Sequence, residues 1–233
     1  MNKSQQLSLE IKLDDQATFE NFYAPRGSSH HLAVLMLQDS RQQTTYLVGN
    51  SGSGLSHLLQ AACQKGPFEA VAQAIYLPMG ELHSYQPEEI LDGLQRLQMV
   101  CLDDLHLVSC KEQWQIPLFN LFNRCKESAT RLVFGSQKLP DDLGVGLADL
   151  LSRLKSGLVH RLVDYRDDDL RRLLQLRANG RGLYISDEVA KFLLERLQRD
   201  TRTLMQALEK LDKASLQEQR RLTIPFVKSV LHL

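Results

Sequence analysis

The sequence predicts an α/β protein, in which a parallel sheet flanked by helices is followed by a small all-α domain. A glycine-rich turn lies between an apolar run and a helical pattern at residues 49–57. Short apolar runs then alternate with helical patterns up to residue 165, and amphipathic helical patterns fill residues 166–233. We therefore predict three parts: a flexible tail over residues 1–16, an α/β domain over 17–165 and a helical lid over 166–233.

Composition limits the function classes. The chain has 233 residues with 28 Lys and Arg against 28 Asp and Glu, so it has no basic excess of the kind that duplex DNA binding usually requires. The four cysteines have no C-x-x-C spacing and are expected to be reduced thiols. No run approaches the roughly 20 apolar residues of a membrane span, and no signal peptide is recognisable. These features predict a cytoplasmic protein whose partners are proteins and a small ligand.

The N-terminal tail is polar, with apolar residues at alternate positions. Alternation is compatible with an edge strand, with a tail that has no fixed structure, or with a peptide that docks on a partner. The stretch also resembles the short motif by which bacterial proteins bind the replicative sliding clamp. The residues that carry this resemblance are Gln6, Leu7, Ser8, Leu9 and Ile11.

The turn after the apolar run Tyr46–Val48 has the spacing of a phosphate-binding loop, G-x-x-x-x-G-K-[ST], with Leu55 at the lysine position. Backbone amides of such a loop bind phosphate oxygens, and the hydroxyl of Ser56 would hold Mg²⁺. Without the lysine, we expect a diphosphate to bind and hydrolysis to be poor. A plain Gly/Ser turn is the alternative. The predicted nucleotide-binding residues are Gly49, Ser51, Gly52, Ser53, Gly54, Leu55, Ser56 and His57.

Two carboxylates follow the predicted strand Met99–Leu102. Ligands of open α/β sheets bind at the carboxyl ends of the strands, so these acids are expected beside the phosphate loop. Asp103 would hold Mg²⁺ through water and Asp104 would orient an attacking water. A simple turn or helix cap is the alternative.

Further strands and helices are predicted along the chain, and two of them carry candidate site residues. Gln137 or Ser136 follows the strand Arg131–Phe134, at a polar strand end that is similar to the one where related ATPases carry a residue that senses the γ-phosphate. Arg153, which follows a predicted helix, can project from the domain edge or can be ordinary surface charge. The remaining predicted segments are helices at 31–38, 87–96 and 114–127 and strands at 74–77 and 158–162.

The last part of the sequence predicts four amphipathic helices. Acidic residues 167–169 suit the start of the first, Ser186 caps the second, the third begins near Thr201, and Pro225 stands at the start of the fourth. Arg202 could reach a phosphate from the third helix, or it could be an exposed helix charge.

In this order, the loop, the paired acids, the polar strand end and the two arginines resemble the AAA+ ATPases, and within them the family of the replication initiator DnaA. The segments that match are Thr18–Phe22, Gly54–Leu58, Leu102–Asp104, Ser152–Leu154 and Arg202–Leu204. The resemblance implies that Phe22 and Arg202 contact nucleotide, that Gln137 is a sensor and that Arg153 is an arginine finger acting in trans.

Because the chain ends without the helix-turn-helix domain of the initiator and begins with a clamp-like tail, it looks like a DnaA-homologous regulator. That resemblance implies docking on the sliding clamp and stimulation of hydrolysis of the ATP bound to DnaA, which yields inactive ADP-DnaA. The chain itself would bind ADP, or another nucleoside diphosphate, with Mg²⁺ and would hydrolyse little ATP alone. It would contact DNA only through the clamp and could form a homo-oligomer. The alternative is an autonomous AAA+ ATPase or a helicase-loader-type replication factor.

Overall fold

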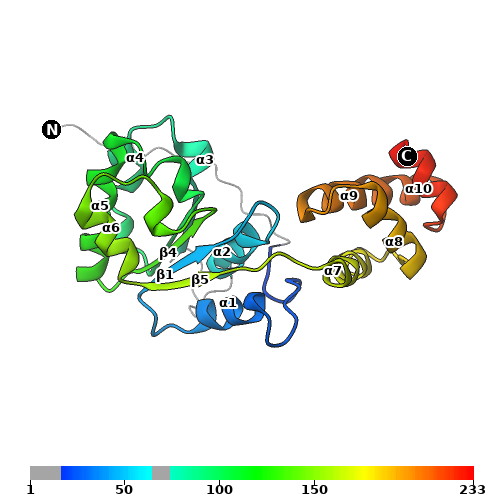
Figure 1. The fold of residues 1–233 in the computed structure, drawn as a ribbon, viewed down its shortest axis with the longest axis horizontal. Helices are drawn as coiled ribbons and strands as arrows, with labels where there is room; N and C mark the ends of the chain where they lie inside the picture. The colour runs from blue at the N-terminus through cyan, green and yellow to red at the C-terminus, as the bar shows by residue number, and fades with distance from the viewer. Residues whose placement is uncertain (1–16, 65–73) are drawn as a thin grey trace. The chain divides into compact units, whose positions relative to one another are not determined.

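The computed structural model describes residues 17–64 and 74–233 (Figure 1). The clamp-like residues Gln6 to Ile11 lie outside the described part. The chain forms two compact units, of which the first ends at Leu162 and the second begins at Val163. Residues 51–54, at the tip of the glycine-rich loop, group with the second unit.

The first unit contains a five-stranded sheet in the order β2-β3-β4-β1-β5, and every neighbouring pair is parallel. Parallel sheets need helical crossovers on their faces, so the alternation in the sequence correctly predicted this α/β fold. The strands are β1 (Thr44–Val48), β2 (Ala74–Pro78), β3 (Met99–Asp103), β4 (Arg131–Ser136) and β5 (Leu158–Arg161).

Helices cover both faces of the sheet, and each face has its own hydrophobic core (Figure 1). On one face, α1 (Ser29–Gln38) and α2 (Leu55–Gln64) pack on side chains such as Leu47 and Cys101. On the other, Tyr46 and Leu102 pack under α3 (Met79–Leu82), α4 (Pro87–Leu91), α5 (Glu112–Glu127) and α6 (Ala148–Lys155). Short 3₁₀ turns lie at Leu94–Arg96, Leu105–Leu107 and Pro140–Asp142. Among the helices of residues 17–64 and 74–233, none has both the length and the hydropathy of a membrane-spanning segment.

The predicted helix at 87–96 is broken in the structure. Helix α4 ends at Leu91, Asp92 is extended, and Gly93 adopts φ +75° before the 3₁₀ turn begins at Leu94. Glycine reaches this left-handed conformation without the steric cost that other residues have, so it ends the helix at this point.

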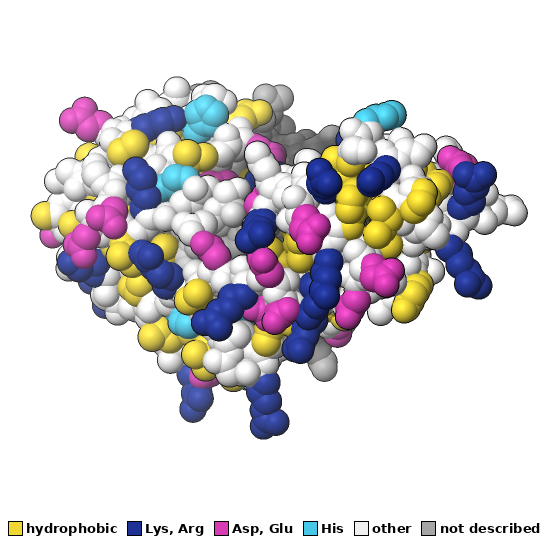
Figure 2. Space-filling view, turned by 45° about the vertical axis from the view of Figure 1, so that its right-hand side comes forward, with side chains coloured by type: hydrophobic (Ala, Val, Ile, Leu, Met, Phe, Trp, Pro, Cys, Tyr) yellow, Lys and Arg dark blue, Asp and Glu magenta, His cyan; other side chains and the backbone are white. Residues whose placement is uncertain are grey.

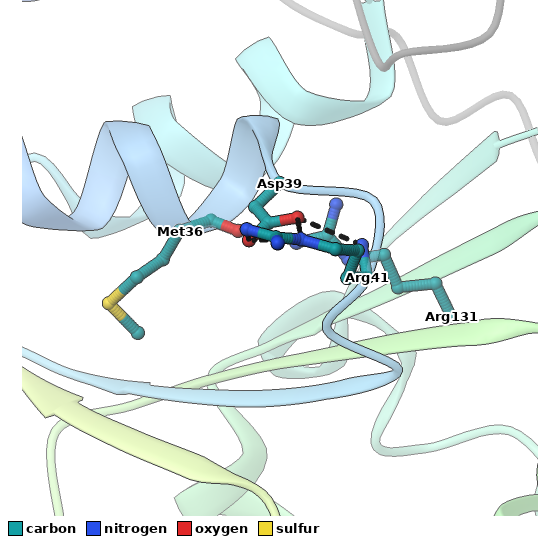
Figure 3. A network of polar contacts seen from close by, with 4 residues as sticks. All are labelled: Met36, Asp39, Arg41 and Arg131. Atoms are coloured by element: carbon teal, nitrogen blue, oxygen red, sulfur yellow. Dashed lines mark hydrogen bonds and ion pairs between the residues drawn. The ribbon is translucent and has the colours of Figure 1, made fainter.

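A buried arginine fastens α1 to the sheet. The Arg131 guanidinium, at the start of β4, donates to the carbonyl oxygens of Leu37 and Met36 at 2.6 and 2.7 Å. These carbonyls belong to the last turn of α1, where helical partners run out. Figure 3 shows Arg131 beside the ion pair of Asp39 and Arg41, which closes the turn after the helix. Burial lowers the pKa of Arg131 from its ordinary value.

The second unit is helical, with α7 (Asp167–Asn179), α8 (Asp187–Arg196), α9 (Thr201–Glu218) and α10 (Ile224–Leu231). The start signals in the sequence are confirmed at two helices. Ser186 accepts a hydrogen bond from the Val189 amide at the start of α8, and α10 has Pro225 in its first turn. The α9 cap is Asp200, whose carboxylate accepts from the Thr203 amide at 2.9 Å.

Candidate nucleotide-binding site

The glycine-rich loop connects β1 to α2. Its first amide, Gly49 N–H, donates to the carbonyl of Ser136 in the neighbouring strand at 3.0 Å. Gly52 and Gly54 have φ of +79° and +85°, which residues with a Cβ rarely adopt. The chain therefore turns sharply from the strand into the helix, as the spacing of the loop predicted.

Leu55, at the position where a phosphate loop carries its lysine, is part of the core. It is 7% exposed and packs in the cluster that contains Leu58 and Leu59. A Cβ on Gly135 would lie 3.5 Å from the Leu55 side chain and only 2.7 Å from Oδ1 of Asp103. The lysine position thus supplies apolar packing between α2 and the sheet, and no positive charge.

Asp103 lies at the carboxyl end of β3 and is 1% exposed. Its Oδ2 accepts a hydrogen bond from the Tyr76 hydroxyl at 2.8 Å, and its Oδ1 accepts from the Asp104 amide at 2.9 Å. Burial, followed by the charge of Asp103 and its hydrogen bond, raises the pKa of Tyr76. The first turn of α2, which carries the predicted metal ligand Ser56, lies near Asp103, because a Cβ on Gly135 would contact both Leu55 and Asp103.

This arrangement fits a magnesium ion that is held together with a nucleotide. The described residues contain no cluster of three or more His, Cys, Asp or Glu that could hold a metal by themselves. Mg²⁺ usually keeps several waters and takes most other ligands from substrate phosphates, so one or two protein groups suffice. A buried carboxylate fixed by two donors, near the first turn of α2 that carries Ser56, meets that requirement.

A hydrogen bond connects the polar segments that follow β3 and β4. Asp104 adopts a left-handed conformation (φ 53°, ψ 36°), which is uncommon for a residue other than glycine. His106 follows in the next turn, and its Nδ1 accepts from the Gln137 amide at 3.4 Å. The hydroxyl of Ser136 is buried and accepts from the Lys138 amide. Gln137, which is exposed, thus remains the candidate sensor.

The segment that carries Phe22 packs against the first turn of α2. The rings of Phe22 and His57 have their centroids 5.1 Å apart, and Nε2 of His57 lies 2.9 Å from the carbonyl oxygen of Thr18. Thr18 and Asn21 exchange side-chain to backbone hydrogen bonds and so fix this segment as a compact turn. Two predicted nucleotide contacts, Phe22 and His57, are therefore brought together.

The two predicted arginines lie in different units. Arg153 lies within the last turn of α6, not after a helix as predicted. It is half-buried, with its guanidinium carbon 5.9 Å from the centre of the Phe122 ring. It makes no hydrogen bond or ion pair through its guanidinium with any residue in 17–64 or 74–233. Arg202 is exposed in the first turn of α9, in the second unit, and its contact with a nucleotide stays a prediction.

Sequence reasoning missed Tyr76 and Gly135. The sequence contained a signal for Gly135, because a glycine inside an apolar strand often marks a position that another group approaches closely. The sequence contained no such signal for Tyr76. Its partner Asp103 is 27 residues away and becomes a neighbour only because β2 pairs with β3.

Comparisons with known proteins assign two parts of the chain to families. Residues 13–161 match the family described as the bacterial DnaA ATPase domain, and residues 167–231 match the family described as the lid domain of Hda.

Solved structures show the same fold. Domain III of the Thermotoga maritima DnaA protein has a TM-score of 0.78 and 23% identity, covering 95% of this chain and 98% of that one. AMPPCP-bound DnaA from Aquifex aeolicus has a TM-score of 0.71 and 23% identity, covering 88% and 67%. The Thermotoga maritima RuvB branch migration motor has a TM-score of 0.69 and 14% identity, covering 93% and 71%.

The match to the ATPase domain spans more than half of the chain, and the lid match follows directly after it. The chain therefore belongs to the DnaA family of AAA+ proteins, as a DnaA-related replication regulator with a lid of the Hda type.

Proposed function

We propose that this protein is a negative regulator of replication initiation. In this proposal, residues Gln6 to Ile11 dock on the DNA polymerase sliding clamp, and Arg153 completes the nucleotide site of ATP-bound DnaA. Hydrolysis in that partner site then yields inactive ADP-DnaA. The regulator itself binds ADP, and Arg202 and Gln137 contact its own nucleotide.

The observation that carries the proposal is the state of Arg153. One face of its guanidinium lies over Phe122, while its N–H donors bond to no described residue. A ring contact of this kind orients the guanidinium and leaves the donors in its plane free for phosphate oxygens. An arginine supplied to a neighbouring site in this way raises hydrolysis rates by roughly 10³ to 10⁵ in comparable systems.

The chain's own site supports binding better than turnover. The loop supplies amides to a diphosphate, and Ser56 with Asp103 would hold Mg²⁺, which neutralises phosphate charge when bound. Leu55 supplies no cation to a transferring γ-phosphoryl group, because its side chain packs in the core. ADP is therefore the expected resident nucleotide, and hydrolysis by the chain alone is expected to be slow.

The direct test measures hydrolysis of labelled ATP bound to DnaA, with the clamp loaded on DNA. Arg153→Ala should bind ADP normally but lose nearly all stimulation, at least about a thousandfold if the whole finger effect is lost. Lys155→Ala, an exposed cation on the same helix, is the matched control and should stimulate normally. Full stimulation by Arg153→Ala would place the finger elsewhere.

The same assay separates docking from chemistry. Changing Leu7 and Leu9 to Ala should abolish retention on immobilised clamp and lower stimulation when clamp is limiting, with the nucleotide site intact. Unchanged retention would refute the assignment of the tail. Turnover of ATP at several per second by the purified chain alone would instead favour the autonomous ATPase or helicase-loader alternative.

A further inference from the structure

The second unit contains a hollow where the end of α9 turns into α10. Its volume is about 400 Å³, and it is lined by Arg220, Arg221, Thr223, Pro225, Phe226 and Ser229. The turn that carries the arginines is well fixed. Gln219 adopts φ 52°, and the Ser215 hydroxyl donates to the carbonyl of Arg220 at 2.7 Å.

Most polar side chains around this hollow make no hydrogen bond or ion pair with the described residues. Within residues 17–64 and 74–233, the side chains of Arg221, Thr223 and Ser229 make no hydrogen bond or ion pair. Arg220 has one ion pair, with Glu218, at 3.4 Å, and both side chains are largely exposed. Such a pair is weak in water and can be exchanged for a stronger anion.

Charge is distributed unevenly along the chain. Residues 163–233 contain 14 Lys and Arg against 11 Asp and Glu, whereas residues 1–162 contain 14 against 17. The final stretch, residues 219–233, has three basic residues and no acidic one. The neutral overall composition therefore conceals a lid that is positive, and its end is the most positive part.

The positive charge continues beside an aromatic surface. Arg196 and Lys228 both lie over the ring of Phe192, at 5.8 and 5.5 Å, which connects α8 to α10. Figure 2 shows Lys and Arg side chains bordering hydrophobic ones on the visible face of the lid, at the right of the view. Phe226 and Pro225 give the hollow an apolar wall.

We propose that this hollow is a nucleic-acid contact that binds the phosphodiester backbone. Guanidinium and hydroxyl donors are the groups that proteins use on phosphate oxygens, and an arginine pair suits a phosphate with several acceptors. The nearby apolar surface suits a sugar or base, as in proteins that bind single strands. The inference is independent of the proposed action on DnaA, and it differs from the expectation that DNA is contacted only through the clamp.

The test is fluorescence anisotropy of the full chain with a labelled single-stranded oligonucleotide, and with its duplex, between 50 and 200 mM salt. Arg221→Gln should weaken binding about fivefold or more and lower the salt slope by roughly 0.7 to 0.9. Arg172→Gln removes the same charge from an exposed position on α7 and should change affinity less than twofold.

A second variant tests the site by gain of affinity. Glu218→Gln removes the carboxylate beside Arg220 and should tighten binding about twofold without altering the hollow. Equal effects of Arg221→Gln and Arg172→Gln, or no gain from Glu218→Gln, would overturn the proposal. It would also be overturned if an acidic peptide or anionic phosphatidylglycerol vesicles bind through Arg221 while the oligonucleotides do not. These binding measurements do not involve hydrolysis of ATP by DnaA. A negative result here therefore leaves the proposed action on DnaA untouched, and the reverse is also true.

Discussion

The Tyr76 hydroxyl holds the Asp103 carboxylate in one orientation, because it donates to Oδ2 while the Asp104 amide donates to Oδ1. Tyr76→Phe keeps the ring in the core and removes only this donor. We expect about tenfold weaker dependence of nucleotide binding on Mg²⁺, since groups that orient a metal ligand are typically worth 10- to 100-fold in metal affinity. Titrating ADP with and without Mg²⁺ measures it. An identical Mg²⁺ effect in both proteins would show that the Tyr76 hydroxyl does not orient Asp103 for the ion.

His106 makes the link between β3 and β4 sensitive to pH. Its Nδ1 accepts from the Gln137 amide, and a protonated ring cannot accept. Burial is the largest cause of the lowered pKa of His106. A lowered pKa means that the contribution to stability is complete above the ordinary value of about 6.5 and is lost as the pH falls below it.

Between pH 7.5 and 5.5, the urea midpoint of the wild-type protein should therefore fall more than that of His106→Gln. The glutamine variant cannot gain a proton, and its carbonyl oxygen retains an acceptor. Parallel pH curves for the two proteins would contradict the assignment of this contact.

At the scale of elements, Arg131 joins the C-terminal turn of α1 to the sheet. Arg131→Met keeps the apolar stem but leaves the two helix carbonyls without these donors. Charge-assisted bonds of this kind are worth about 1.5–3 kcal/mol each, and a loss of about 2–4 kcal/mol in unfolding free energy is expected. Chemical denaturation measures it. The control Arg41→Met removes an exposed arginine from the same network and should leave the midpoint nearly unchanged. Similar losses in both variants would mean that burial of Arg131 does not matter.

The sequence predicted elements well where a local signal was present. Ser186 and Pro225 marked helix starts, and the five apolar runs became the five strands, each within a few residues. The helix at 87–96 was wrong, because Gly93 was read as part of a helical pattern whereas its positive φ ends the helix. Gly93 was itself a local stop signal, since glycine often follows the last residues of a helix, and the prediction did not use it.

The sequence predicted those parts of the candidate site that lie directly at the ends of strands. The loop and Gln137 each follow a strand and Asp103 ends one, so a parallel sheet brings them to one edge. The contacts that tune the site come from pairs distant in sequence, such as Tyr76 with Asp103 and Gln137 with His106. Which residues meet in such a pair depends on the order and register of the strands, and the sequence pattern does not determine either.

At the scale of the whole molecule, the preference of this protein for ADP over ATP can be measured through its thermal stability. Leu55, which packs in the core, is the residue to change. A ligand that binds only the folded protein raises its melting temperature by an amount that grows with the logarithm of the ligand concentration divided by Kd. Wild-type protein should gain more from ADP than from ATP, because the γ-phosphate adds charge and Leu55 offers no cation to it.

Leu55→Lys should lower the melting temperature of the unliganded protein and shift the ratio of ATP to ADP affinity roughly tenfold toward ATP, which corresponds to about 1.4 kcal/mol. The lysine stem can replace the leucine contacts while its ammonium extends toward the phosphates. Leu55→Met is the matched control, since it keeps an apolar side chain of similar volume and should keep the preference for ADP. Melting curves at matched nucleotide concentrations decide between them. If all three proteins prefer ADP to the same degree, the residue before Ser56 does not face the phosphates, and the explanation of slow turnover by this chain must be sought outside the loop.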